Sequence, residues 1–205
     1  MVNLPEAFQD SSEAAIASYT FSEFASGIGV VQLNLCDLML PGGAVNTIDY
    51  LLHPSTISPK AGFLSYAGAA IDIDFDVTIN KPIRIEGTAI INIMHGTNTT
   101  TTPGSNTFTI TLYKVIGMTE TSLGSAVLIA PITNNGNTIS TLACRIELSA
   151  TNLKIGEKIR LNISAPAIAN TTEYIGTDPT DTYSAAGVLP HSNSRIYIPS
   201  KVDLG

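Results

Sequence analysis

Hydrophobic and polar residues alternate with a period of two along much of the chain after Gly27. The clearest alternation starts at Ile71, where Ile, Phe and Val occupy the odd positions up to Ile79, while three aspartates and a threonine occupy even positions. A period of two is typical of a β-strand with one buried face. The same reasoning predicts further strands near residues 28–38, 48–52, 63–66, 83–94, 107–113, 125–132, 138–148, 158–164 and 195–202.

Segments rich in Gly, Pro, Asn, Ser and Thr separate the predicted strands. We expect the polar segment 96–106 to be an exposed tip that joins the strands on either side of it into an antiparallel hairpin. Asn135-Gly136 is a turn sequence that predicts a second hairpin. A second long polar segment, residues 170–194, is expected to be a loop.

Eight to ten antiparallel strands with one apolar face each require two packed sheets or a closed barrel. We therefore predict an all-β protein whose residues 27–205 form a single antiparallel β-sandwich domain of jelly-roll type. Residues 1–26 differ, because they hold acidic residues and three phenylalanines without a sustained periodic pattern. We expect them to form a short arm that docks on a partner or a neighbouring subunit through Phe8, Phe21 and Phe24.

Composition supports this interpretation and narrows the partners. The chain has 205 residues, of which 44% are hydrophobic and 13% charged, with a formal net charge of −7. This length and apolar content suffice for a substantial core. The acidic balance argues against nucleic-acid and anionic-membrane partners, which require clustered Lys and Arg. No apolar run approaches a membrane span, and no Lys or Arg precedes Lys60 to form the basic region of a secretory signal.

The two cysteines, Cys36 and Cys144, both lie in apolar strand-like runs. Two interpretations remain open for them. They are either buried thiols or the two halves of one disulfide, and neither has the spacing of a metal ligand.

A search for catalytic motifs finds few candidates. The three histidines, His53, His95 and His191, fall in predicted loops or at strand ends, and none is spaced from another ligand as metal sites require. The sequence holds no Gly-x-Ser-x-Gly motif, and the glycines at 27 and 29 lack the third glycine of a dinucleotide site. We therefore predict that the protein is not an enzyme and expect no cofactor.

The unusual charge feature is the row Asp72, Asp74 and Asp76 on one face of a predicted strand. Three neighbouring carboxylates repel one another, and a divalent cation such as Ca²⁺, which prefers oxygen ligands, would relieve the repulsion. The alternative is an exposed acidic face that protects a sheet edge. Lys81 and Arg84 are close in sequence and are candidates for partial compensation.

Four segments, combined with the acidic arm, resemble jelly-roll structural proteins of tailed-virus particles, especially capsid decoration or vertex proteins. The segments are Lys81–Ile93, Lys158–Ser164, Gly176–Pro179 and Arg195–Leu204. The resemblance implies a non-enzymatic virion protein that binds and stabilises the capsid surface, as a homotrimer in contact with the major capsid protein or another virion protein. It also implies synthesis in the host cytoplasm and a final location on the virion.

A protein of another class fits the same pattern. A carbohydrate- or receptor-binding β-sandwich of a tail fibre would grip its ligand with loops at one end, where Tyr174 and Tyr183 are the candidate contacts. The absence of Trp and an aromatic content of 6% count against this alternative.

Overall fold

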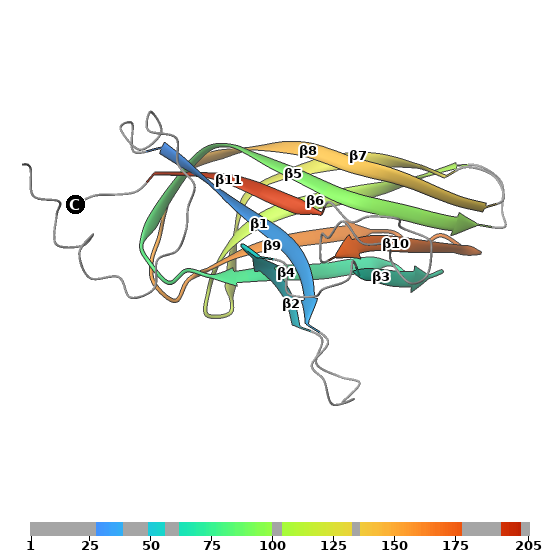
Figure 1. The fold of residues 1–205 in the computed structure, drawn as a ribbon, viewed down its shortest axis with the longest axis horizontal. Helices are drawn as coiled ribbons and strands as arrows, with labels where there is room; N and C mark the ends of the chain where they lie inside the picture. The colour runs from blue at the N-terminus through green and yellow to red at the C-terminus, as the bar shows by residue number, and fades with distance from the viewer. Residues whose placement is uncertain are drawn as a thin grey trace, which may run out of the picture.

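The protein is described by a computed structural model, which covers residues 28–38, 49–55, 62–99, 104–132, 136–177 and 194–201. Within these ranges the chain forms strands, turns and bends, so the prediction of an all-β protein is confirmed. These ranges contain no helix long and apolar enough to cross a membrane. The strands described, one more than the largest number predicted, are β1 (Ile28–Leu38), β2 (Asp49–His53), β3 (Gly62–Ala67), β4 (Ile71–Thr78), β5 (Ile83–Thr99), β6 (Gly104–Ile116), β7 (Thr119–Ile132), β8 (Gly136–Leu153), β9 (Lys158–Ala165), β10 (Thr171–Thr177) and β11 (Arg195–Lys201) (Figure 1).

All eleven described strands belong to one hydrogen-bonded sheet, and ten of them follow one another in the order β3-β10-β5-β11-β1-β2-β4-β9-β6-β7. The eighth strand pairs with the remaining edge of β5 along almost its whole length. The pairs are antiparallel, as predicted, except that β2 meets β4 in a parallel pair through Leu51 and Asp76. The 17-residue β5 thus has β8 on one edge, and β11 and β10 in succession on the other.

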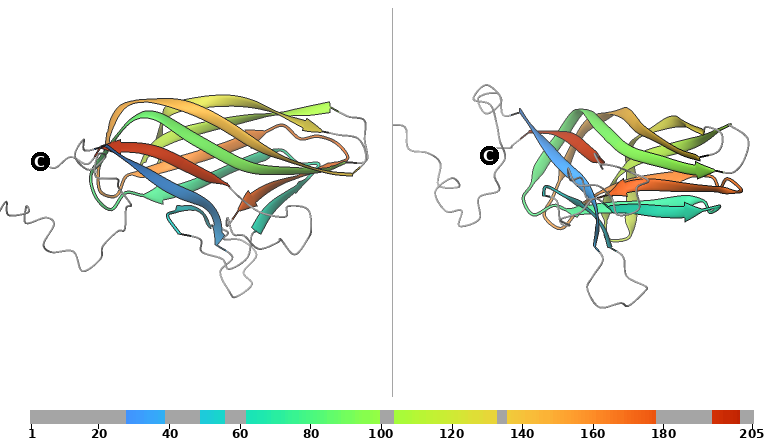
Figure 2. Two further views of the ribbon diagram at one scale, coloured as in Figure 1. Left: turned by 45° about the horizontal axis from the view of Figure 1, so that its top comes forward. Right: turned by 45° about the vertical axis from the view of Figure 1, so that its right-hand side comes forward.

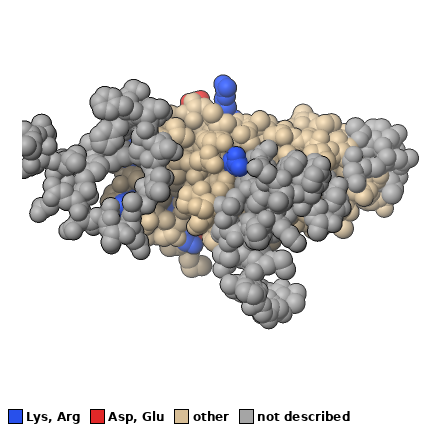
Figure 3. All heavy atoms as spheres, viewed as in Figure 1, with Lys and Arg blue, Asp and Glu red and all other residues tan. Residues whose placement is uncertain are grey.

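The sheet folds back on itself, so that strands distant in the ladder order face one another (Figure 2). The enclosed side chains form one hydrophobic core, which includes Leu35 of β1, Phe75 of β4, Ile91 of β5 and Phe108 of β6. Alternate residues of strands such as β4 and β9 reach this core, which explains the period of two in the sequence. Among the described residues visible in Figure 3, few side chains are charged, in keeping with the composition.

A glycine of β7 packs tightly against β8. Gly124 of β7 has a φ of +156°, and a Cβ atom placed there would lie 2.5 Å from Cγ2 of Ile146 on β8. Such a distance is shorter than side-chain carbon atoms tolerate. The close packing of β7 on β8 therefore requires the missing side chain.

Both predicted hairpins are wrong in their pairing. The sixth strand pairs with β7 and β9 instead of β5, and β8 pairs with β5, with no ladder to β7 among the described residues. Alternation shows which face of a strand is buried, but it does not specify the neighbouring strand. Two predicted loops also contain strand residues, because β5 continues to Thr99 and residues 171–177 form β10.

Of the two interpretations of the cysteines, the structure supports buried thiols. Cys36 and Cys144 are both buried, and they form no disulfide. Burial raises the pKa of the Cys144 thiol to about 11. This side chain belongs to the hydrophobic core and is therefore a packing element.

Candidate functional site

Polar side chains gather on the face of β4, β9, β6 and β7 that points away from the core. Cross-strand pairing places residues of these strands directly opposite one another. We call this surface the outer face, and its central rows are Asp72, Ser164, Thr109 and Val127; Asp74, Asn162, Thr111 and Ser125; and Asp76, Arg160, Tyr113 and Ser122.

The positive charge of Arg160 on β9 offsets the negative charge of two of the three aspartates, Asp74 and Asp76. Its Nε and Nη2 atoms donate hydrogen bonds to the two carboxylate oxygens of Asp76, at 2.7 and 2.9 Å. The third guanidinium nitrogen, Nη1, lies 2.9 Å from Oδ2 of Asp74 and 2.6 Å from Oε1 of Glu120. One planar cation thus links β4, β9 and β7, which is a geometry that Arg forms and Lys does not.

Two more side chains of β9 complete the network. Lys158 Nζ lies 3.2 Å from Oδ2 of Asp76. Asn162 Nδ2 donates hydrogen bonds to Oδ1 of Asp72 at 2.9 Å and to Oδ1 of Asp74 at 2.8 Å. Both amide protons of Asn162 are therefore used, and the second oxygen of Asp72 accepts no hydrogen bond within the described part of the chain.

The network changes the acidity of its central pair. Burial alone would raise the pKa of Asp76, but the hydrogen bonds from Arg160 and Lys158 outweigh it and hold the pKa below the usual value. The hydrogen bonds to Asp76 raise the pKa of the Arg160 guanidinium. Both groups therefore stay charged at neutral pH, and the ion pair is a permanent feature of this face.

Next to the network lies a shallow trough of about 430 Å³. It is lined by Ile71, Asp72, Thr107, Thr109, Asn162, Ser164, Ala165 and Pro166. The middle of the trough is low because Ser164 and Thr109 are small, and Asp72 stands along one side. On the other side Val127 and Ile129 of β7 lie opposite Thr109 and Thr107, and they are 65% and 69% exposed. The trough therefore has the Asp72 carboxylate on one side, and the exposed apolar side chains of β7 lie beside it, next to its lining residues Thr107 and Thr109.

The acidic row was predicted as a possible cation site, with Lys81 and Arg84 as compensating cations. The structure places Lys158 and Arg160 against the row, whereas Arg84 contacts Glu86 at 3.2 Å. The described residues contain no group of three or more His, Cys, Asp or Glu able to hold a metal ion. The Ca²⁺ site stays a prediction.

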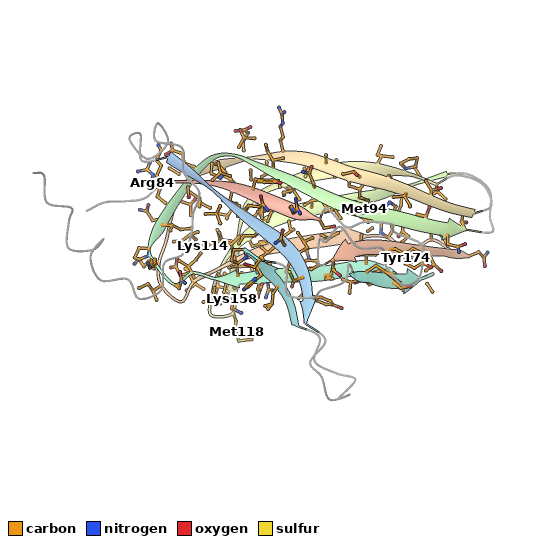
Figure 4. The ribbon with its side chains drawn as sticks, in the orientation of Figure 1. Arg84, Met94, Lys114, Met118, Lys158 and Tyr174 are labelled. Carbon is orange, nitrogen blue, oxygen red and sulfur yellow. The ribbon has the colours of Figure 1, made fainter. Side chains whose placement is uncertain are left out.

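The other predicted site residues are not brought together with the acidic row. Tyr174 lies on β10, where its ring packs edge-on against Phe63 of β3 with centroids 5.3 Å apart. It lies towards the end of the molecule opposite to Lys114 and Lys158 (Figure 4). The remaining predicted contacts, Phe8, Phe21, Phe24 and Tyr183, lie outside the described residues.

A buried polar cluster was missed by the sequence analysis. Glu173 of β10 is 2% exposed, and both of its carboxylate oxygens accept hydrogen bonds from Nδ2 of Asn106, at 2.9 and 2.8 Å. His95 Nε2 lies 3.5 Å from Glu173, and His95 Nδ1 lies 3.1 Å from Oγ of Ser140. The prediction had placed His95 at a strand end and Glu173 in a loop. Thr171, Glu173, Ile175 and Thr177 are all buried, and because three of these four inward residues are polar, hydrophobic alternation does not reveal the strand.

Comparisons with known proteins identify the fold without a family. No family model matches the sequence, and no curated protein matches it. A CocE/NonD family hydrolase from Staphylococcus aureus has a similar structure, with 14% sequence identity and a TM-score of 0.57, over 84% of this chain and 37% of the hydrolase chain. An aminopeptidase from a marine sediment Thaumarchaeota archaeon matches at 8% identity with a TM-score of 0.54, over 83% of this chain and 37% of its own. Infectious bursal disease virus matches over 80% of this chain and 42% of the viral chain at 10% identity, but its TM-score of 0.28 is too low to support an argument.

These matches contradict the prediction that the protein is not an enzyme. The sequence analysis linked the predicted fold to non-enzymatic virion proteins. Solved structures named as a hydrolase and an aminopeptidase contain a similar fold. At these identities the similarity establishes a common fold. The chain spans little more than a third of the length of these two proteins.

Proposed function

We propose that the folded-over sheet is a jelly-roll sandwich. The order of strands supports this proposal, because it contains the four-stranded halves β1-β11-β5-β8 and β4-β9-β6-β7. Along the chain, β4 belongs to the second half, β5 to the first, β6 and β7 to the second, β8 to the first and β9 to the second. Repeated crossing between two four-stranded sheets is the connectivity of a jelly roll.

The function that we propose is that of a jelly-roll module of a virus particle, a capsid decoration or vertex protein that binds the major capsid protein or another virion protein. The strand order carries this proposal, because jelly rolls recur among viral capsid and lectin domains. The sequence resemblance in Lys81–Ile93 and Lys158–Ser164 adds to it, since these segments form parts of β5 and β9 in the two halves.

We propose that the arm attaches the module to the particle. Residues 1–26 carry Phe8, Phe21 and Phe24 as apolar anchors among acidic residues. Anchors of this kind bind apolar pockets, and the acidic residues require Lys or Arg on the partner. A homotrimer would present three arms to the particle at once. Simultaneous attachment of the three arms would raise the apparent affinity without new kinds of contact.

Co-sedimentation with particles assembled from the major capsid protein of the same virus tests this function. The full chain should bind saturably, at a stoichiometry that is a multiple of three. A variant lacking residues 1–26 should fold but lose most of the binding. Failure of the full chain to sediment with particles, or equal binding by the truncated chain, would contradict the proposal.

A second candidate function is carbohydrate or receptor binding, the alternative considered from the sequence. The observation that favours it is the trough on the outer face, where a carboxylate and hydroxyl groups lie beside the exposed apolar side chains of β7. The two functions are compatible when the docked arm leaves the outer face exposed.

A further inference from the structure

We infer that the trough on the outer face is a binding site for a neutral carbohydrate. The inference rests on the proposed function in one respect, because it requires the outer face to be exposed when the arm is docked. It replaces Tyr174 and Tyr183 with a different set of residues, on strands at the opposite end of the ladder order from β10, which carries Tyr174.

The spacing of the strands in the sheet sets the width of the surface around the trough. Asp72, Ser164, Thr109 and Val127 lie opposite one another on four adjacent strands. At the usual spacing between strands this row is roughly 14 Å across. The open, shallow form, with Pro166 among its lining residues, suits a short chain of rings lying flat against the sheet.

The polar and apolar side chains match the two kinds of surface on a sugar. Sugar hydroxyls donate and accept hydrogen bonds, while the C–H groups of a pyranose ring form an apolar patch. Asp72 has a carboxylate oxygen with no described partner, and such an oxygen forms strong charge-assisted hydrogen bonds with hydroxyl donors. Val127 and Ile129, both more than 60% exposed, offer an apolar surface beside the trough, opposite its lining residues Thr109 and Thr107.

The polar groups of the trough are held in place before a ligand arrives. Asn162 is fixed by its bonds to Asp72 and Asp74, and Arg160 fixes Asp74 and Asp76 in turn. A ligand that binds this row therefore does not have to order the side chains first, which lowers the cost of binding.

The charge of the face selects for neutral sugars. It carries four carboxylates against two cations: Asp72, Asp74, Asp76 and Glu120 against Lys158 and Arg160. Arg160 is already occupied by three of these carboxylates. Sialylated or sulfated glycans would meet excess negative charge and should bind less well than neutral glycans.

The test uses the full chain on a glycan array, followed by saturation-transfer NMR with the best neutral glycan. We expect reproducible binding of neutral glycans, with a dissociation constant on the order of millimolar for one trough because the site is shallow. Asp72→Ala and the double variant Val127→Ser/Ile129→Ser should each lower binding at least fivefold. Ile155→Ser removes a 67% exposed apolar side chain that, unlike Val127 and Ile129, is not paired with a lining residue of the trough. It is the matched control and should bind like the unaltered chain.

Three outcomes would overturn the inference. They are no glycan binding, a preference for anionic glycans, and binding that survives the trough variants but is lost in Tyr174→Ala or Tyr183→Ala. Co-sedimentation with particles is measured on the same samples, so the two proposals can fail separately. Particle binding without glycan binding rejects the carbohydrate site alone, and trough variants that lose particle binding would show that the outer face is the protein contact.

Discussion

Arg160 lies directly opposite Asp76 and holds both of its carboxylate oxygens, through Nε at 2.7 Å and Nη2 at 2.9 Å. Asp76 is also the residue at which β4 meets β2, opposite Leu51 in the parallel pair. The ion pair therefore stabilises the place where the ladder passes from the β1-β2 side of the fold to the β4-β9 side. The three neighbouring aspartates of β4, which would repel one another, are thus held in the sheet by hydrogen bonds and ion pairs from β9.

Removal of the Asp76 charge should destabilise the protein. Asp76→Asn leaves Arg160 partly buried without its two-point partner, and we expect a loss of about 1 to 3 kcal/mol in the free energy of unfolding at pH 7. Urea titration measures this loss. Asp72→Asn is the matched control, because Asp72 is exposed and accepts one hydrogen bond from Asn162. Equal stability of the two variants would contradict the assigned role.

The same pair predicts the direction of a pH effect. The pKa of Asp76 is lower in the folded state than its ordinary value of 3.8. Its contribution is therefore complete above the unfolded pKa and is lost as the pH falls through the folded pKa. The stability difference between the unaltered chain and Asp76→Asn should be constant from pH 5 to 7 and should shrink below about pH 4. A difference that grows on acidification would rule out this pairing.

Close packing of β7 on β8 predicts a cost for any side chain at position 124. Gly124→Ala places a Cβ atom against Ile146, and we expect a loss of about 2 to 3 kcal/mol from overpacking. Gly104→Ala is the control, because nothing lies within 4 Å of a Cβ atom there. Thermal unfolding of both variants measures the difference. A Gly124→Ala protein as stable as the control would mean that the two strands are not in contact.

The buried polar cluster predicts coupling between Asn106 and Glu173. Asn106→Ala removes the donor to both carboxylate oxygens, and a buried carboxylate left in this state costs about 2 to 4 kcal/mol. Glu173→Gln should restore part of this loss in the Asn106→Ala background, because a neutral amide is cheaper to bury. Denaturant unfolding of the two single variants and the double variant measures the coupling. Additive effects would show that the two side chains act independently.

Burial of the two thiols predicts low reactivity toward a thiol reagent in the folded protein. Both cysteines are buried and form no disulfide, and the raised pKa of Cys144 keeps it protonated. A thiol reagent at pH 8 should therefore react negligibly with the folded protein and with two thiols per chain in urea, without prior reduction. Fast reaction of the folded protein, or no reactive thiol after unfolding, would contradict the structure.

Periodicity predicted the strands whose buried faces are apolar. The predicted strands at 71–79 and 158–164 match β4 and β9 to within one residue at each end, because Ile, Phe, Val and Leu mark every inward position. The end of β5 and the whole of β10 were missed, since their inward positions hold Thr97, Thr99, Thr171 and Glu173. Hydropathy cannot mark an interior that is stabilised by hydrogen bonds between polar groups.

The sequence analysis identified only part of the candidate site. Asp72, Asp74 and Asp76 stand out along one strand, but their partners on β9 are 82 or more residues away in the chain. Val127 and Ile129 join the site because β7 pairs with β6. Such pairings depend on the global topology, which local alternation does not encode.

Hydrogen–deuterium exchange of the full chain, free and bound to virus particles, tests the central claim most directly. The account predicts that binding protects peptides from residues 1–26 and leaves exchange unchanged on β6, β7 and β9, because the arm docks and the outer face stays exposed. Protection of β6, β7 and β9 with no change in residues 1–26 would contradict it.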